Sequence, residues 1–405
     1  MSSPATPPSF DDIQQAAKRI ESAIVNTRFE KSVTLSNILC ADIWLKFENL
    51  QFTSSFKERG ALNKLLQLSD EEKKRGVITM SAGNHAKAVA YHAQLLDIPT
   101  TVVMPRNTPN VKVEDTRNFG AHIKLHGITL DDSGVYAREL TKSENLVLIH
   151  PYDDEQIIAG QGTVALEMLA KNPDLQVLVI PIGGGGLIAG NAIAAKTIKP
   201  DIKIIGVEVE SYASAYQLFH DKPQSLQGST IAEGIAVKEP GQLTMSIIRE
   251  LVDDIVLVNE EAIEEAINQL ITVEKTVTEG AGAAALAAVA SHPSHFSNLQ
   301  TGVFLCGANI DSRILASVLM RRLVRKGRIV RYQIRITDLP GTLSDITEII
   351  GNAGGNILEV SHQRMFPNVP VKDADLYLTV ETRDTQQSEE ILQKLRDFGF
   401  QTTHS

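Results

Sequence analysis

The sequence predicts an α/β protein in which a two-lobed domain precedes a small α+β domain. Three observations lead to this fold class. Strand-like apolar runs alternate with helix-like patterns from about residue 76 to residue 306, which is typical of parallel sheets covered by helices. Four consecutive glycines, 183–186, follow one of these runs. After about residue 330 the pattern changes to short alternating strands and two amphipathic helices.

Composition limits the class of protein. The chain has 405 residues, of which 43% are hydrophobic, enough for two or three packed domains. Its formal charge of −10 is spread along the sequence, which argues against nucleic acid or an anionic membrane as the main partner. Cys40 and Cys306 form no metal-binding or redox pattern, and no signal peptide or membrane-spanning run is found. We therefore expect a cytoplasmic protein without disulfides.

The first lobe contains a regular strand and helix alternation. Apolar residues at helical spacing predict a first helix over 10–24, and 43–48 is predicted to be a strand. From 52 to 150 the alternation predicts one compact α/β subdomain. Its expected strands are 76–80, 100–104, 121–125 and 146–149, and its expected helices are 86–96, 110–118 and 133–143.

The second lobe is centred on the apolar run 176–181, which is typical of a strand buried on both faces. Further strands are expected at 202–208 and 302–306, and helices at 162–170, 260–270 and 279–289. The two lobes together are expected to span residues 1–320.

The tail has a different pattern. Basic residues over 321–329 predict a linker, and 330–405 is predicted to be a separate domain. The expected elements are a strand at 330–336, a helix at 343–353, strands at 357–365 and 375–381, and a helix at 386–398. This βαββα order suits a ferredoxin-like α+β module.

Lys57 is the first candidate for chemistry. It follows Ser54, Ser55 and Phe56 where helical spacing begins, so Ser54 or Ser55 is the expected N-cap and Lys57 falls in the first turn. The helix dipole and a dry, Phe-walled setting would both lower its pKa. The neutral amine forms a Schiff base with an aldehyde such as pyridoxal phosphate. For a lone lysine, a surface position on an amphipathic helix is the simpler interpretation.

The glycine run 183–186 lies between a buried strand and a helix that starts near Leu187, so its amides could bind a phosphate. No Gly-Lys-Ser/Thr follows, which excludes a P-loop nucleotidase. A dinucleotide fold stays open, because 184–189 fits its G-x-G-x-x-A pattern and Glu208 follows at a plausible distance. A tight turn without a ligand is the remaining alternative.

Three further loops follow expected strands, where α/β folds place their ligands. The loop 81–85, Ser-Ala-Gly-Asn-His, offers groups that could bind a carboxylate and a phenolic oxygen. Taken alone, it is an ordinary capping turn with satisfied polar groups. The loop 276–282, with Glu279, and the loop 305–309, with Cys306, are weak signals singly.

Together these segments resemble the threonine dehydratases, or threonine ammonia-lyases, a branch of the pyridoxal-phosphate enzymes with the tryptophan-synthase-β fold, fold type II. The similarity covers roughly residues 10–320, with the motifs in the same order and spacing. In the tail, 338–343 and 354–357 resemble an ACT-type regulatory domain. The resemblance implies a catalytic domain over 1–320 and a regulatory domain over 330–405.

The resemblance assigns a role to each motif. Lys57 would hold pyridoxal 5′-phosphate, Phe56 would pack near its ring, and Asn84 would bind the phenolic oxygen. The phosphate would be held by Gly183, Gly184, Gly185, Gly186 and Leu187. Cys306 would face the pyridine nitrogen as a neutral thiol, which suits β-elimination.

The implied reaction is the dehydration and deamination of L-threonine to 2-oxobutanoate and ammonia, with L-serine giving pyruvate. Lys57 would take the Cα proton, while Ser81, Asn84 and His85 would hold the carboxylate. Such an enzyme would serve isoleucine biosynthesis or threonine catabolism.

Other activities remain open at this point. Serine racemases and hydroxyaspartate-type ammonia-lyases also resemble the chain, but they carry Ser at the position of Ala82, so we expect little racemisation. Glu208 matches the divalent-metal site of those relatives, but 210–214 lacks the second carboxylate, and no metal ligand is expected. A nicotinamide-dependent oxidoreductase and a non-catalytic amino-acid sensor are more distant alternatives.

In the tail, Asp338, Gly341 and Asn356 are the candidate regulatory residues. Paired tails would bind an amino-acid or nucleotide effector at the Gly341 and Asn356 loops, within a homodimer or homotetramer. The alternative is a dimerisation module without a ligand.

Overall fold

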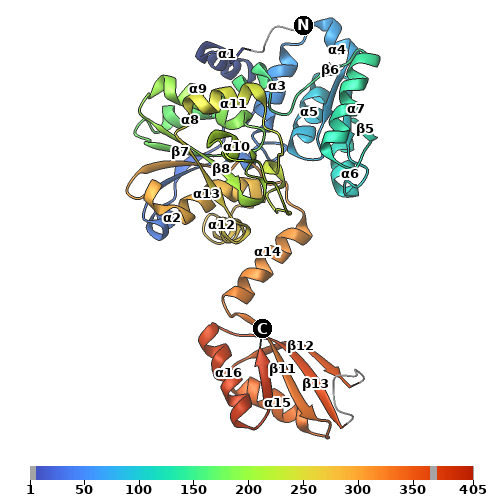
Figure 1. The fold of residues 1–405 in the computed structure, drawn as a ribbon, viewed down its shortest axis with the longest axis vertical. Coiled ribbons are helices and arrows are strands. Elements are labelled where there is room, and N and C mark those ends of the chain that lie inside the picture. Colours follow the sequence, from blue (N-terminus) through green and yellow to red (C-terminus); the bar gives the residue numbers. More distant parts are fainter. Residues whose placement is uncertain (1–5, 365–371, 405) are drawn as a thin grey trace. The chain divides into compact units, whose positions relative to one another are not determined.

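A computed structural model describes residues 6–364 and 372–404, and the chain divides into two compact units, Met1–Asp311 and Ser312–Ser405 (Figure 1). The helices of the first unit are α1 Phe10–Ile20, α2 Val33–Leu39, α3 Lys57–Leu66, α4 Asp70–Arg75, α5 Asn84–Leu95, α6 Asn110–Asn118, α7 Leu130–Ser143, α8 Glu155–Lys171, α9 Gly186–Ile198, α10 Ser214–Phe219, α11 Gln242–Leu251, α12 Glu260–Thr272 and α13 Gly280–Ser291. Among the described helices, none combines the length and the apolar character that a membrane span requires.

The larger sheet of this unit is formed by β1 Phe29–Lys31, β2 Asp42–Lys46, β7 Val177–Pro181, β8 Lys203–Val209, β9 Asp254–Val258 and β10 Gln300–Phe304. Its strand order is β1-β2-β10-β7-β8-β9, and neighbours are parallel except β1 with β2. In Figure 1, α8, α9 and α11 lie on one side of this sheet and α12 and α13 on the other. Strand β7 is buried along its whole length, as its apolar run predicts.

The smaller sheet is formed by β3 Val77–Met80, β4 Thr100–Met104, β5 His122–Leu125 and β6 Val147–Leu148, all parallel, in the order β5-β4-β3-β6. Its strands lie within residues 52–150. Ala86 of α5 and Val113 of α6 pack with Val102, whereas Ala137 of α7 packs with Ile78 in a separate cluster. The predicted α/β fold class is confirmed in both lobes.

The start of α3 differs from the prediction. Its N-cap residue is Phe56, and no side chain caps the helix, so the expected cap at Ser54 or Ser55 is wrong. Ser54 instead adopts a left-handed conformation with φ of 62°, and Ser55 forms a β-bridge with Gly307. Tertiary contacts, rather than a local cap, define where this helix begins.

Helix α11 and strand β9 are not predicted by the sequence pattern. The backbone N–H groups of Gln242 and Thr244 donate to the Asp153 carboxylate, each at 3.1 Å. Because Asp153, which accepts from these first-turn N–H groups, lies far from α11 in the chain, no capping signal precedes the helix in the sequence.

The second unit contains α14 Ser312–Arg325, β11 Ile329–Thr337, α15 Thr342–Asn352, β12 Asn356–Gln363, β13 Asp373–Glu381, α16 Thr385–Asp397 and β14 Gln401–His404. Its antiparallel sheet has the order β12-β13-β11-β14. Two details differ from the prediction: β14 adds a strand beside β11, and α14 extends into the expected linker at 321–329. The end of the expected strand at Met365 lies outside the described residues.

Candidate active site

Lys57 is the first residue of α3, and it is half-buried. The Nζ atom donates a hydrogen bond to the backbone carbonyl of Pro151 at 2.7 Å and lies 5.2 Å from the centre of the Phe56 ring. Burial lowers the pKa of Lys57 to about 8, although Cys306 and Glu279 act in the opposite direction. The amine therefore has a substantial neutral fraction near neutral pH, which a nucleophilic or basic lysine requires.

The loop before Lys57 is attached to the loop at 305–309. Phe56 N–H donates to the carbonyl of Cys306 at 3.1 Å, and Ala308 N–H donates to that of Ser54 at 2.9 Å. These contacts bring two of the predicted motifs together, although more than 240 residues separate them in the sequence.

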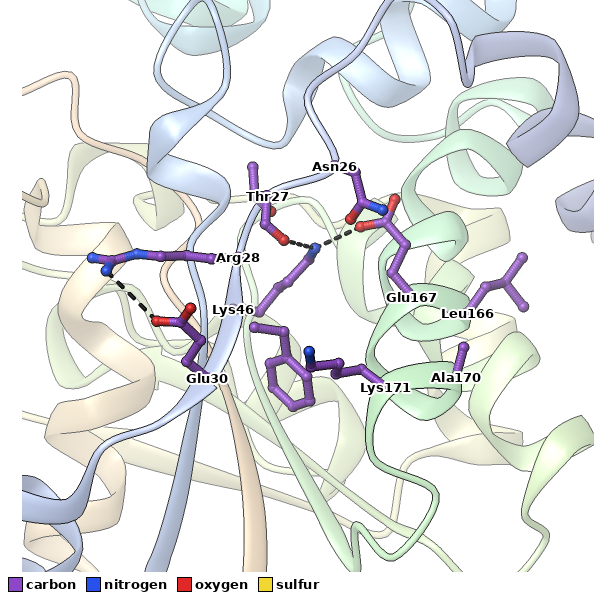
Figure 2. Close-up of a pocket in the computed structure, with 10 residues that line it drawn as sticks. Asn26, Thr27, Arg28, Glu30, Lys46, Leu166, Glu167, Ala170 and Lys171 are labelled. Atoms are coloured by element: carbon purple, nitrogen blue, oxygen red, sulfur yellow. Dashed lines mark hydrogen bonds and ion pairs between the residues drawn. The ribbon is translucent and has the colours of Figure 1, made fainter.

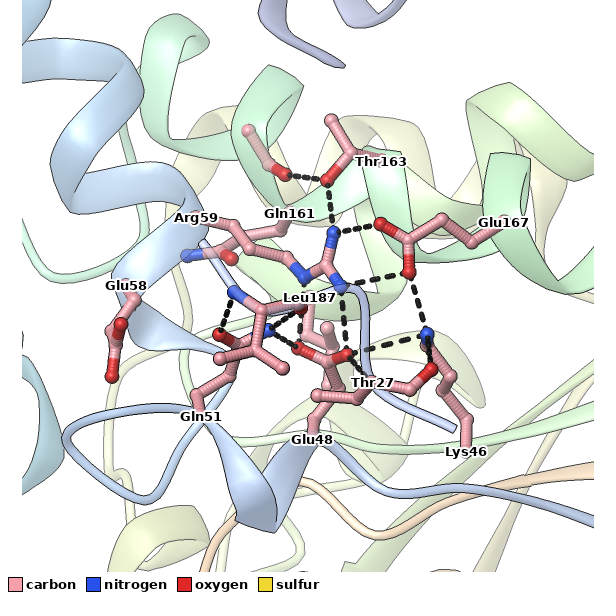
Figure 3. Close-up of polar contacts among 12 residues, drawn as sticks. Thr27, Lys46, Glu48, Gln51, Glu58, Arg59, Gln161, Thr163, Glu167 and Leu187 are labelled. Carbon is pink, nitrogen blue, oxygen red and sulfur yellow. Dashed lines mark hydrogen bonds and ion pairs between the residues drawn. The ribbon is translucent and has the colours of Figure 1, made fainter. Parts of the chain in front are cut away.

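A buried ion network, which was not predicted from the sequence, surrounds Arg59 of α3 (Figure 3). Arg59 donates to Glu48 through Nε and Nη2, both at 2.8 Å, and to Glu167 through Nη1 and Nη2 at 2.6 and 2.9 Å. Lys46 Nζ contacts Glu167 at 2.5 Å. Burial alone would raise the pKa of Glu48, but Arg59 and Lys46 lower it to about 2. Since Arg59 follows Lys57 by two residues, this charged network holds the helix that carries the lysine.

The glycine run 183–186 connects β7 to α9. Gly185 adopts a left-handed conformation with φ of 94°. A Cβ atom on Gly184 would lie 2.1 Å from the Tyr152 ring, and one on Gly185 would lie 2.7 Å from Thr244 Oγ1. The run ends at the start of α9, where first-turn N–H groups have no partner within the helix. This geometry suits a phosphate group.

The loop 81–85 connects β3 to α5. Gly83 N–H donates to Ser81 Oγ at 3.2 Å, and Asn84 begins the helix without a side-chain cap. Asn84 Oδ1 and His85 Nδ1 are buried and have no hydrogen-bond partner among the described residues. The interpretation of this loop as a capping turn with satisfied polar groups is therefore wrong.

His85 is held in one chemical form. Its Nε2 lies 3.1 Å from the carbonyl of Ile149, so Nε2 carries the proton and Nδ1 is an acceptor. Burial and the nearby Lys57 lower its pKa to about 3, so the ring is neutral. The only N–H group of this neutral tautomer is already bound to the Ile149 carbonyl, so His85 cannot donate to a substrate carboxylate. The hydroxyl of Ser81 and the first N–H groups of α5 are better donors for that role.

Asn84 also connects this loop to the loops at 276–282 and 305–309. Its Nδ2 donates to Glu279 Oε1 at 2.7 Å, and Glu279 N–H donates to the carbonyl of Gly307 at 3.0 Å. Burial raises the pKa of Glu279 to about 7. Cys306 Sγ donates to the carbonyl of Ala281 at 3.3 Å, and burial raises the pKa of its thiol, which stays neutral. Glu279 was noted in the sequence, but no role followed from its pattern.

These contacts form a continuous path around one site. Lys57 reaches Pro151, whose neighbour Tyr152 packs against the glycine run. A Cβ atom on Gly183 would meet the carbonyl of Gly234 at 3.0 Å, and one on Gly234 would meet Glu279 at 3.3 Å. Glu279 in turn accepts a hydrogen bond from Asn84, which closes the path. The five motifs singled out in the catalytic part of the sequence thus lie around one centre.

No metal centre emerges at this site. Within residues 6–364 and 372–404, no three His, Cys, Asp or Glu side chains gather as metal ligands would. Glu208 accepts hydrogen bonds from the N–H groups of Ala215 and Tyr216 at 3.0 and 2.7 Å, and burial raises its pKa to about 7.

The candidate regulatory residues are separated within the second unit. Asp338 follows β11 and pairs with Arg364, and Gly341 precedes α15 with φ of 96°. Asn356 begins β12 and pairs with Glu381, the last residue of β13. Thr337, next to Asp338, pairs with Asp373 at the opposite end of β13. Strand β13 spans about 26 Å between those ends at roughly 3.3 Å per residue. One copy of the chain therefore does not bring Asp338 and Asn356 together.

The pocket in Figure 2 is lined by residues other than the predicted site residues. Its volume is about 680 Å³, and Lys46 and Glu167 of the buried network form part of its wall. The lining residues are Asn26, Thr27, Arg28, Phe29, Glu30, Lys46, Leu166, Glu167, Ala170 and Lys171.

Comparison with known proteins identifies the family. A family model for pyridoxal-phosphate dependent enzymes matches residues 20–307 of the chain. The chain belongs to the pyridoxal-phosphate dependent enzymes. A model for ACT domains matches residues 333–400 of this pyridoxal-phosphate enzyme. The nicotinamide-dependent alternative that the glycine pattern left open is therefore set aside.

Several relatives resemble this pyridoxal-phosphate enzyme over most of their length. An L-threonine ammonia-lyase of Thermotoga maritima is 40% identical over 395 residues, 97% of this chain and 98% of the relative. A catabolic L-threonine dehydratase of Escherichia coli is 43% identical over 309 residues, 75% of this chain and 94% of the relative.

Solved structures agree with this assignment. Threonine deaminase isoform 2 of Solanum lycopersicum is 36% identical, with a TM-score of 0.71 over 78% of this chain and 90% of the other. Maize serine racemase is 34% identical, with a TM-score of 0.73 over 78% of this chain and 98% of the other. The predicted fold type II catalytic domain with a C-terminal ACT domain is confirmed.

The site of this pyridoxal-phosphate enzyme fits its cofactor. The buried, partly neutral amine of Lys57 suits an aldehyde, and the start of α9 suits a phosphate. Ser55 Oγ, Asn84 Oδ1 and Thr278 Oγ1 are buried without a hydrogen-bond partner among the described residues, so polar atoms of a ligand can satisfy them.

Proposed function

We propose that this chain is a threonine ammonia-lyase, which converts L-threonine to 2-oxobutanoate and ammonia and also acts on L-serine to give pyruvate. One observation carries the proposal: the 40% identity to an L-threonine ammonia-lyase extends over 97% of the chain, through both the catalytic and the ACT segments. The partly neutral amine of Lys57, which belongs to one of the five motifs at the site, agrees with this chemistry.

Each residue at the site has a task that its geometry supports. Pyridoxal phosphate, when bound, supplies the electron sink that makes the Cα proton of the substrate removable. Lys57 acts as the base for that proton, because its buried amine is partly neutral. Ser81 and the first N–H groups of α5 bind the substrate carboxylate. The neutral Cys306 thiol would face the pyridine nitrogen and leave it unprotonated.

Serine racemisation is the second candidate, because maize serine racemase is a close structural match. Ala82 argues against it, since alanine offers no hydroxyl that could move a proton on the opposite face of the substrate. The discriminating experiment follows L-serine with the purified protein and measures D-serine and pyruvate together. We expect pyruvate to exceed D-serine by at least tenfold. D-serine formed at a rate comparable with pyruvate would make racemisation the better assignment.

The direct test of the main proposal measures 2-oxo acid release from a panel of amino acids. L-threonine and L-serine should give ammonia and 2-oxo acid in equal amounts, whereas L-alanine, which lacks a β-hydroxyl, should give neither. Absence of 2-oxo acid from both substrates, despite a bound cofactor, would instead support a non-catalytic amino-acid sensor.

The setting of the enzyme is also part of the proposal. The ACT domain supports control by an amino-acid effector, with a nucleotide as the alternative, in a cytoplasmic homodimer or homotetramer. Because Asp338 and Asn356 lie at opposite ends of β13, an effector that contacts both needs two copies of the domain. Such an enzyme would work in isoleucine biosynthesis or in threonine catabolism.

A further inference from the structure

Glu279 occupies an unusual position for a carboxylate. It is the N-cap residue of α13, yet its side chain does not cap that helix. Oε1 instead accepts a hydrogen bond from Asn84 Nδ2 at 2.7 Å, and only 8% of the residue is exposed. The side chain therefore gives up a favourable interaction with its own helix and binds an amide on α5.

The surroundings leave the carboxyl group little freedom. A Cβ atom on Gly307 would lie 2.4 Å from Glu279 Oε1, and one on Gly234 would lie 3.3 Å from it. The Glu279 N–H group also donates to the Gly307 carbonyl at 3.0 Å. Backbone thus contacts the side chain from two segments, and its direction toward Asn84 is fixed by packing.

This contact decides how the Asn84 amide is turned. Glu279 Oε1 accepts from the NH₂ end of the amide at 2.7 Å. In its ionised form the carboxylate also excludes the flipped orientation, because it can only accept hydrogen bonds. Asn84 Oδ1 is then held elsewhere, in a buried position where it has no partner among the described residues. Asn84 keeps one N–H and one carbonyl oxygen for a ligand.

We propose that Glu279 is a positioning residue, which fixes the Asn84 amide in the orientation that binds the cofactor ring. This inference rests on the proposed function, because it concerns the cofactor of that reaction. Glu279 acts through Asn84 and does not itself touch the substrate. Removal of the Glu279 side chain should therefore change the affinity and the absorption of the bound cofactor, as well as the rate of the reaction.

The test compares Glu279→Ala, Asn84→Ala and the double variant, prepared with cofactor. For each protein, the dissociation constant of pyridoxal phosphate and the wavelength of its visible absorption band are measured. We expect each single substitution to weaken cofactor binding at least tenfold and to shift the band in the same direction. The double variant should resemble Asn84→Ala, because Glu279 has nothing to orient once the amide is absent.

Further variants separate positioning from a purely structural role. Glu279→Gln keeps an acceptor but adds a donor that also fits the flipped Asn84 amide, so its cofactor affinity should lie between those of the wild type and Glu279→Ala. Glu279→Met fills the same space without an acceptor, and it should repeat the loss even if Glu279→Ala fails to fold. Glu144→Ala is the matched control, because the Glu144 side chain is 44% exposed and pairs with Lys124, away from the site.

Two outcomes overturn the proposal: unchanged cofactor affinity and absorption in Glu279→Met, or losses that multiply in the double variant. Release of 2-oxobutanoate by the wild-type protein is measured in the same preparations. Its absence, together with the expected change in cofactor binding, would reject the threonine ammonia-lyase function but retain the role of Glu279.

Discussion

At the scale of single residues, the environment of Lys57 accounts for its chemistry. The amine donates to a backbone carbonyl rather than to a carboxylate, and burial is the main cause of its lowered pKa. A salt bridge would have kept the lysine charged. The sequence predicted a lowered pKa from the helix start and from a dry, Phe-walled setting, and burial is the cause that lowers it in the structure.

The lowered pKa of Lys57 predicts how fast the cofactor-free protein captures pyridoxal phosphate. The neutral amine reacts, so the rate should rise about tenfold per pH unit below pH 8 and level off above it, because the pKa is about 8 rather than the usual 10.5. Stopped-flow absorbance between pH 6.5 and pH 10 measures this. Free lysine with a blocked α-amine is the control, and a protein rate that still climbs tenfold from pH 9 to pH 10 would contradict the prediction.

Burial of the Glu279 carboxyl group is expected to lower the free energy of unfolding at neutral and alkaline pH. Its pKa is raised by burial from 4.5 to about 7, so the unfolded chain loses its proton first and stability falls as the pH rises from 4.5 through 7. At pH 8 this costs about 3 kcal/mol, at about 1.4 kcal/mol per pH unit. Glu279→Gln should therefore have the higher Tm at pH 8, with a smaller difference at pH 5. An equal difference at both pH values would show that the carboxyl group is not buried as described.

At the scale of elements, the buried network determines how α3 is held. Arg59 and Lys46 balance Glu48 and Glu167, two positive against two negative charges. Of these, Arg59, Lys46 and Glu48 are fully buried. Such groups are costly to bury, so removing one partner leaves the others without compensation.

Glu167→Ala should destabilise the protein by about 3 kcal/mol, because Arg59 and Lys46 would keep only one buried carboxylate between them. Chemical unfolding of the cofactor-free protein measures this. Glu30→Ala is the control, since the Glu30 side chain lines the same pocket but is 61% exposed and should change stability by less than about 1 kcal/mol. Equal effects of the two substitutions would mean that the network adds no stability.

The elements also show what can be predicted from the sequence. Strands such as β7 and the glycine turn after it were predictable, because apolar runs and glycines carry local signals. The start of α3 and the presence of α11 were not, because a β-bridge to Gly307 and the carboxylate of Asp153 determine them. The motifs around Lys57 were recognisable in the sequence from their residue types and from their positions after predicted strands. The role of Glu279 was not, because it depends on a contact with Asn84, 195 residues away.

At the scale of the whole molecule, the chain combines a catalytic unit with an ACT unit. The Escherichia coli relative matches 75% of this chain but 94% of its own length, so that relative has little beyond the matched segment.

A chain that ends at Arg328 should retain turnover of L-threonine within about threefold and lose its response to effectors. The reason is that the ACT match begins at residue 333, beyond the cut. Initial rates with and without isoleucine, valine and nucleotides measure both properties, with the full-length chain as control. An unchanged effector response in the shortened chain would place regulation in the catalytic unit.

The most direct test of the central claim is the rate of 2-oxobutanoate release from L-threonine by the wild type and by Lys57→Ala, at equal cofactor concentration. We predict a loss of at least about 10³-fold, because the variant lacks both the amine that holds the cofactor and the base for the Cα proton. Deamination by Lys57→Ala at the wild-type rate would contradict the account.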